Sequence, residues 1–215
     1  MTKSNKTKAH TIYRLKDGTK VVGTTTITNI LAKPALVVWA NRIGLQGIDV
    51  AKYVDDKADI GTLAHAIITN ELAGKPTDTS DYSKNQISSA ENSVLSFYEW
   101  KKGKTIEPIL IEAPLVSEEH RYGGTMDVYA KIDGALELLD LKTGSGIWPE
   151  HFYQVGGGYL ELLKENLFEV ERIRILNIPR TKDESFQEQV VKAEDCGLYW
   201  EIFYHCLRIY ELKKR

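Results

Sequence analysis

The sequence predicts a single α/β domain in which helices flank a mixed central β-sheet. The chain has 215 residues, of which 42% are hydrophobic. That is enough for one sizeable core and short for two. Segments with the 3.6-residue spacing of amphipathic helices are interspersed with segments that alternate apolar and polar residues, as strands do. We therefore expect one domain over residues 11–215, preceded by a flexible basic tail over residues 1–10.

The first half of the chain is predicted to be mainly helical after a short hairpin. Residues 12–22 are typical of a hairpin, because Lys16, Asp17 and Gly18 form a turn signal. Pro34 would end a helix that opens at Thr24, and Asp59 is a candidate N-cap for a later helix. The helices expected in this half cover residues 24–31, 35–42, 59–72 and 82–102.

The second half is predicted to hold the sheet. Residues 125–132 carry apolar side chains at even positions and polar atoms at odd positions, so Asp127 would lie on the polar face of a half-buried strand. Asp133 and Gly134 are a hairpin signal, after which a second strand returns. The elements expected here are strands at 108–116, 125–132, 136–142 and 170–177, and helices at 149–165 and 194–213.

Three consecutive glycines, Gly156 to Gly158, interrupt the apolar stripe of the helix expected at 149–165. Each glycine in a helix interior costs about 1 kcal/mol relative to alanine, so some close approach should compensate. Two interpretations are open. The helix packs tightly on the sheet there, or the glycines leave room for a nucleic-acid backbone beside Gln154.

Asp127, Asp140 and Lys142 form the candidate site. Asp140 and Lys142 are two residues apart and share one face of the returning strand, so all three side chains can meet. Burying such charges costs several kcal/mol per ion unless they are paired or bind a metal. Two carboxylates suit Mg2+ or Mn2+, and Lys142 could position the attacking water. A buried ion pair that stabilises the hairpin is the alternative interpretation.

Several segments, taken in chain order, resemble the motifs of one enzyme superfamily. The chain is similar to the PD-(D/E)xK nuclease superfamily over roughly residues 20–165, and specifically to its RecB-like exonuclease branch, which includes phage exonucleases and the mitochondrial genome maintenance exonuclease. The resemblance implies a restriction-endonuclease-like core, whose order of elements is helix, three strands, helix, strand. The matching segments are Gly23–Ile27, Gly61–His65, Gly123–Asp127, Asp140–Thr143 and Gln154.

The resemblance also implies roles for these residues. Asp127 and Asp140 would bind the metal, helped by His65 and by the backbone carbonyl of Leu141, while Lys142 would be the catalytic lysine and Gln154 a further site residue. Apart from the resemblance, a lone histidine such as His65 is more often packed or solvated.

The sequence departs from the family pattern at one tyrosine. The branch places a tyrosine four residues after the glutamine, whereas Tyr159 follows Gln154 by five. On an α-helix this spacing turns the two side chains apart. We therefore expect Tyr159 to lie outside the site.

Other residues are weaker candidates. Glu112 could be an outer carboxylate of the site, although most strand glutamates are solvated, and His151 lies one turn before Gln154. The four tryptophans are assigned no function, because a base-stacking platform would need aromatic rings clustered beside basic residues. Cys196 and Cys206 are expected to be buried thiols in a reducing compartment.

Composition limits the partners. The net charge of −2 gives no global positive field, so contact with DNA would depend on local clustering of lysine and arginine. No apolar run approaches the roughly 20 residues that cross a bilayer, and the first ten residues have no apolar core. We expect no membrane contact and a cytoplasmic location, in the host cytoplasm if a phage encodes the chain. No P-loop pattern is present, so no nucleotide cofactor is expected.

These observations predict a Mg2+- or Mn2+-dependent deoxyribonuclease. We expect an exonuclease of phage or bacterial recombination or repair that acts on DNA with a free end, together with an unidentified recombination partner. A structure-specific endonuclease of the resolvase type would use the same residues. A non-catalytic nucleic-acid-binding domain is the third possibility, and the intact set of Asp127, Asp140 and Lys142 speaks against it.

Overall fold

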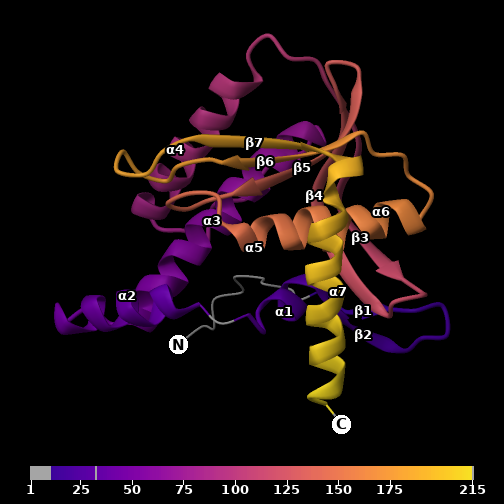
Figure 1. The fold of residues 1–215 in the computed structure, drawn as a ribbon. Helices are drawn as coiled ribbons and strands as arrows, with labels where there is room; N and C mark the ends of the chain where they lie inside the picture. Colours follow the sequence, from indigo (N-terminus) through magenta and orange to yellow (C-terminus); the bar gives the residue numbers. More distant parts are fainter. Residues whose placement is uncertain (1–10, 32, 215) are drawn as a thin grey trace.

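The computed structural model describes residues 11–31 and 33–214, so the basic tail predicted over residues 1–10 lies outside the described residues. Within them, helices cover both faces of a mixed β-sheet, which confirms the predicted α/β class (Figure 1). The strands are β1 (Tyr13–Arg14), β2 (Lys20–Gly23), β3 (Ile106–Ser117), β4 (Tyr122–Ile132), β5 (Ala135–Lys142), β6 (Arg172–Asn177) and β7 (Gln187–Lys192).

The order of elements along the chain is the predicted one: a helix, three strands, a helical segment and a further strand form the core. No described helix has both the length and the apolar character needed to cross a bilayer. The helices are α1 (Thr24–Thr28), α2 (Pro34–Leu45), α3 (Val50–Leu72), α4 (Lys84–Lys101), α5 (Pro149–Phe152), the π-helix η1 (Tyr153–Tyr159), α6 (Leu160–Glu165), the 3-10 turn η2 (Ala193–Cys196) and α7 (Gly197–Leu212).

β4 is the strand around which the sheet is organised. β3 pairs antiparallel with it along one edge. The other edge is divided: β2 runs parallel to its start, where Gly23 lies opposite Gly123, and β5 runs antiparallel to its end, where Leu139 lies opposite Val128. β6 continues parallel to β5, and β7 closes that side antiparallel. Between residues 123 and 128 the divided edge of β4 therefore carries no ladder pair.

Two hydrophobic cores cover the two faces of the sheet. One joins α1, η1, α6 and α7 to the sheet and includes Ile27, Val155 and Phe203. The other joins α3 and α4 to the opposite face and includes Ile68 and Phe97. The predicted alternation is present in β4, whose even positions 126–132 are buried while Thr125, Asp127 and Lys131 are not. Tyr129 departs from it and is only 3% exposed, because the second face is covered as well. Polar groups on this strand must find partners inside the protein.

The beginnings of two helices show what local signals could and could not establish. α3 begins at Val50 and not after Asp59, because the Asp49 side chain accepts a hydrogen bond from the Lys52 amide and no helix breaker follows. α4 begins as expected within two residues, where Ser83 and Gln86 form a capping box. β7 was not predicted from the sequence, since its residues are largely polar and it pairs only with β6.

The glycine run lies in the π-helix η1 and is packed mainly against α7. A Cβ atom added to Gly157 would lie 2.5 Å from the Tyr199 carbonyl oxygen and 2.8 Å from Cβ of Phe203. The Tyr122 hydroxyl donates a buried hydrogen bond of 2.8 Å to the Gly158 carbonyl, which satisfies a group in the widened turn. Tight packing is thus the correct interpretation of the glycines, although their main partner is α7 and not, as the sequence had suggested, the sheet. The alternative of room for a nucleic-acid backbone was wrong, because α7 fills that space.

We predict that Gly157→Ala destabilises the protein by about 1–3 kcal/mol, because a methyl group there meets the backbone of α7 and cannot be accommodated by a rotamer change. Urea unfolding measures the change. Gly197→Ala is the matched control: a Cβ atom there has no neighbour within 4 Å, so stability should be unchanged or slightly higher. Equal stability of the two variants would contradict the packing argument.

Candidate metal centre

The candidate site lies where β5 leaves the edge of β4. Ladder pairing between the two strands ends at Val128 and Leu139. Just beyond that point the Leu141 amide donates a hydrogen bond of 2.7 Å to Oδ2 of Asp127. A side-chain carboxylate thus takes the place of a backbone acceptor, and this bond fixes Asp127 above the end of β5.

Helix α3 brings His65 to the same point. A Cβ atom on Gly61 would lie 2.5 Å from the Thr143 hydroxyl oxygen, so a glycine is needed for α3 to approach the end of β5 this closely. One turn later, Nδ1 of His65 lies 3.4 Å from Oδ1 of Asp127. The predicted convergence of His65 and Asp127 is therefore present in the structure.

His65 and Asp127 stabilise each other in their charged forms. Burial by itself lowers the pKa of His65, but the Asp127 carboxylate outweighs it and the pKa is raised. Burial likewise raises the pKa of Asp127, yet His65, Lys142 and the Leu141 amide bring it below the usual value. A cation bound here would replace the proton of His65, since metal-binding imidazole must be neutral.

Strand β3 adds a carboxylate that the sequence offered only as an outer candidate. Glu112 faces the position of Asp127 in the β3–β4 ladder and has a left-handed φ of 48°, which is uncommon for a residue with a side chain. Its carboxylate lies with the ligand atoms of His65 and Asp127 in a group whose members are all within 4.8 Å of one another. Burial and the Asp127 charge raise the pKa of Glu112 to about 7. The strained backbone therefore holds a third ligand in place.

Asp140 and Lys142 form a buried ion pair, with Nζ 2.6 Å from Oδ2. Lys142 is the one partner found for Oδ2 of Asp140 among the described residues. Burial, reinforced by the Asp127 charge, raises the pKa of Asp140 to about 6 in spite of the lysine. A buried carboxylate beside a cluster of oxygen and imidazole ligands is what a divalent cation would stabilise, so the residues present fit a metal.

Gln154 and Tyr159 lie together, contrary to the expectation that their spacing separates them. Nε2 of Gln154 is 2.7 Å from the Tyr159 hydroxyl oxygen and 3.0 Å from Oγ1 of Thr25. The prediction assumed an α-helix, whereas in the π-helix η1 residues five apart fall on one face. Burial and the charges of Asp140 and Asp127 raise the pKa of Tyr159 well above its usual range, so its hydroxyl stays protonated. Only the glycine run signalled this irregular turn.

Two adjoining pockets give access to these residues. The larger, of about 710 Å3, is lined by Glu112, Asp127 and one side of α3. The smaller, of about 380 Å3, is lined by Leu141, Lys142 and the segment that follows β5. The two share His65, Thr143 and Arg180, so they form one cleft that passes the candidate metal centre.

Comparisons with known proteins give only remote likenesses. No protein-family model and no curated protein sequence matches the chain. Among solved structures, a candidate exonuclease from Eubacterium rectale is 13% identical with a TM-score of 0.47, over 72% of this chain and 65% of its own length, which is less than two thirds. An alkaline exonuclease from Laribacter hongkongensis is 11% identical with a TM-score of 0.40, over 90% of this chain and 92% of its own. Such likenesses decide nothing about function, which therefore rests on the geometry of the site.

We predict that Asp140→Asn stabilises the metal-free protein at pH 8 by about 1–3 kcal/mol. The pKa of Asp140 in the folded protein, about 6, exceeds the usual aspartate value of 3.8. The wild-type protein therefore loses stability as the pH rises from 3.8 to about 6, because Asp140 ionises. The uncharged asparagine of the variant does not ionise, so the variant avoids this loss. Urea unfolding in EDTA at pH 8 and at pH 4 measures it, and the gain should nearly vanish at pH 4. A variant less stable than the wild type at pH 8 would contradict the prediction.

Proposed function

We propose that this protein is a Mg2+- or Mn2+-dependent deoxyribonuclease of the PD-(D/E)xK type, and that it acts as an exonuclease. The observation that carries the proposal is the convergence of Asp127, His65 and Glu112 within one ligand cluster, with the Asp140–Lys142 pair coupled to it. A structural ion pair alone would not explain why three further potential ligands and a strained backbone meet at this point.

Asp127, Asp140, His65 and Glu112 would hold the cation, with the Leu141 carbonyl as a further candidate ligand. When bound, the cation would supply Lewis-acid activation of the scissile phosphate and of water. Lys142 offers only donors, so its Nζ would hold the attacking water and stabilise negative charge on the phosphate. Water adds to phosphorus and releases a proton to solvent, the bond to the leaving oxygen breaks, and that oxygen takes a proton from solvent.

Gln154 would act beside this centre as a hydrogen-bond donor to the DNA backbone, exchanging one of the two hydrogen bonds that its Nε2 donates within the protein for one to a phosphate oxygen. Its amide is fixed by Thr25 and Tyr159, so little side-chain freedom is lost when a phosphate oxygen binds. A role in phage or bacterial recombination or repair, an interacting recombination protein and a cytoplasmic location are predictions from the sequence.

Asp127→Asn is expected to abolish DNA hydrolysis and to weaken Mn2+ binding in calorimetry. Lys142→Gln should retain Mn2+ binding but lower turnover by about 10²–10⁴-fold, since lysine contributes to the reaction and not to metal ligation. Asp195→Asn, at an exposed aspartate outside the cleft, is the control and should behave as the wild type. Wild-type hydrolysis by Asp127→Asn would place the active site elsewhere and leave a non-catalytic domain as the better description.

The exonuclease assignment predicts how the DNA substrate matters. Hydrolysis of end-labelled linear DNA should not depend on sequence, because phosphate contacts position the strand without reading bases. It should fall steeply with added salt, as counterion release requires. Closed circular DNA, single- or double-stranded, should be almost resistant. Rapid cutting of single-stranded circles, or of branched junctions at internal positions, would contradict the exonuclease assignment and indicate a structure-specific endonuclease. The assignment of the metal ligands would be unaffected.

A further inference from the structure

The smaller pocket differs in chemistry from the larger one. The larger pocket carries the carboxylates Glu112 and Asp127 as well as the cations Lys57 and Arg180. Among the described residues that line the smaller pocket there is no carboxylate, and two are the cations Lys142 and Arg180. Its volume of about 380 Å3 falls in the range of small-molecule sites. The pocket is therefore suited to an anionic group next to the metal centre.

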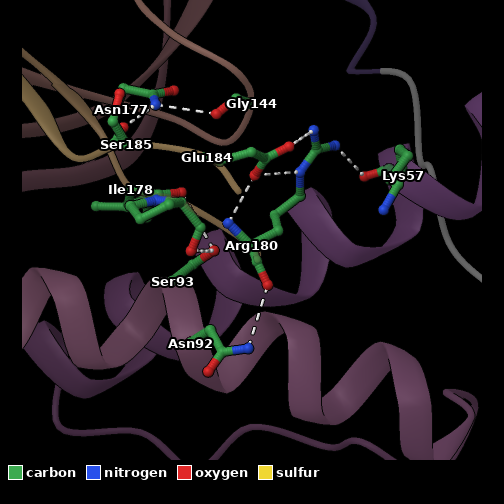
Figure 2. Close-up of polar contacts among 10 residues, drawn as sticks. Lys57, Asn92, Ser93, Gly144, Asn177, Ile178, Arg180, Glu184 and Ser185 are labelled. Atoms are coloured by element: carbon green, nitrogen blue, oxygen red, sulfur yellow. Dashed lines mark hydrogen bonds and ion pairs between the residues drawn. The ribbon is translucent and has the colours of Figure 1, made fainter. Parts of the chain in front are cut away.

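The segment from Thr143 to Trp148, which forms the wall of this pocket, is held rigidly. Nδ2 of Asn177 donates a hydrogen bond of 2.9 Å to the Gly144 carbonyl, as Figure 2 shows. Gln187 accepts a bond of 2.8 Å from the Ile147 amide, and Nδ1 of His151 accepts one of 3.2 Å from the Trp148 amide. A wall tied at three successive points is pre-organised for a ligand.

Trp148 stands at this pocket with an indole that is 55% exposed, whereas Trp100 is buried. Trp39 and Trp200 are partly buried and have aromatic neighbours. An exposed indole that shares a pocket with Lys142 and Arg180 offers one ring beside two cations, on which one base can stack. This juxtaposition is visible only in the fold.

The guanidinium of Arg180 is held by neighbouring groups, but not all of its N–H groups are hydrogen-bonded to them. Its Nε and Nη2 pair with the Glu184 carboxylate, at 3.2 Å and 2.5 Å, and Nη1 approaches the Lys57 carbonyl at 3.5 Å (Figure 2). A guanidinium has five N–H groups, so two remain for a phosphate. Lys57 adds a positive charge close to Glu184, whose pKa it helps to lower.

The pocket also offers a neutral partner for a base. Burial and the charges of Lys142 and Lys33 lower the pKa of His151 to about 3, so its ring is neutral. Since Nδ1 accepts from the Trp148 amide, Nε2 carries the proton and is a donor. Asn177 is fully buried, so its amide supports the wall of the pocket and does not reach a ligand. The Nε2 donor of His151 suits an acceptor atom of a nucleobase.

We propose that this smaller pocket is a nucleotide pocket, which binds one unpaired nucleotide of the DNA strand with its base stacked on Trp148 and its phosphate between Lys142 and Arg180. The inference rests on the proposed function and deepens it, because it defines the substrate as single-stranded DNA or a frayed end. A paired base cannot stack on an indole from the side, so an intact duplex would have to open first.

The test measures binding without hydrolysis. The anisotropy of a dye-labelled oligo-dT is followed in EDTA with the wild type, Trp148→Leu and Trp148→Phe. Loss of one stacked base should weaken single-strand binding by about 5- to 100-fold in Trp148→Leu. Phenylalanine should restore most of it, and binding of a blunt duplex should change much less. The control Trp39→Leu, at a partly buried indole on α2, should bind as the wild type.

Arg180 and Glu184 provide a matched pair for the phosphate contact. Both Arg180→Gln and Glu184→Gln break the same ion pair. If Arg180 binds phosphate, only Arg180→Gln weakens single-strand binding and reduces the salt dependence by about one counterion, whereas Glu184→Gln binds as well or more tightly. Equal losses in the two variants would show that the pair only anchors the loop and would overturn the phosphate contact.

The outcomes separate the two proposals. If Trp148→Leu binds single strands within about twofold of the wild type, the nucleotide pocket is wrong, even where the wild type hydrolyses DNA. If Trp148→Leu loses single-strand binding as expected but the wild type does not hydrolyse DNA with any metal ion added, the nucleotide pocket is supported and the nuclease proposal is wrong. Failure of the wild-type protein to bind single-stranded DNA overturns both.

Discussion

The hydrogen bond from the Leu141 amide to the Asp127 carboxylate is the interaction on which the site depends. Two antiparallel strands that stayed paired would use this amide in the ladder. Because β5 parts from β4 after Leu139, the amide needs another acceptor, and the side chain of Asp127 supplies it. That requirement holds a charged group in a covered sheet, at the point where α3 and β3 deliver His65 and Glu112.

The sequence was informative where local pattern and tertiary structure agree. Alternation and the Asp133–Gly134 turn were sufficient to pair β4 with β5 and to bring Asp127 near Asp140. The pattern could not show that the second face of β4, which carries Tyr129, is also covered, because that depends on η1, α6 and α7, which follow later in the chain. Asp49 and Asp59 are equally good caps in local terms, and only the uninterrupted helix between them selects Asp49.

The position of Tyr159 shows that a prediction from residue spacing depends on the type of helix that is assumed. A five-residue separation excludes a contact in an α-helix and permits it in a π-helix. The wide turn is stabilised from outside, by the Tyr122 hydroxyl on the Gly158 carbonyl and by α7 against Gly157. Neither partner is close in sequence. The glycine run was therefore a sign of close packing, and its consequence for Gln154 and Tyr159 required the whole fold.

The distribution of charge along the cleft links metal binding to DNA binding. With a net charge of −2, the protein does not attract DNA through a global field. Attraction must come from Lys142 and Arg180 in the smaller pocket, whereas Glu112 and Asp127 in the larger pocket repel a phosphate until a cation neutralises them, in spite of Arg180 and Lys57 there. Lys142 lines the smaller pocket and is paired with Asp140. A strand could therefore enter from the cationic side in the metal-free protein, but its scissile phosphate would reach the carboxylates only once the cation is in place.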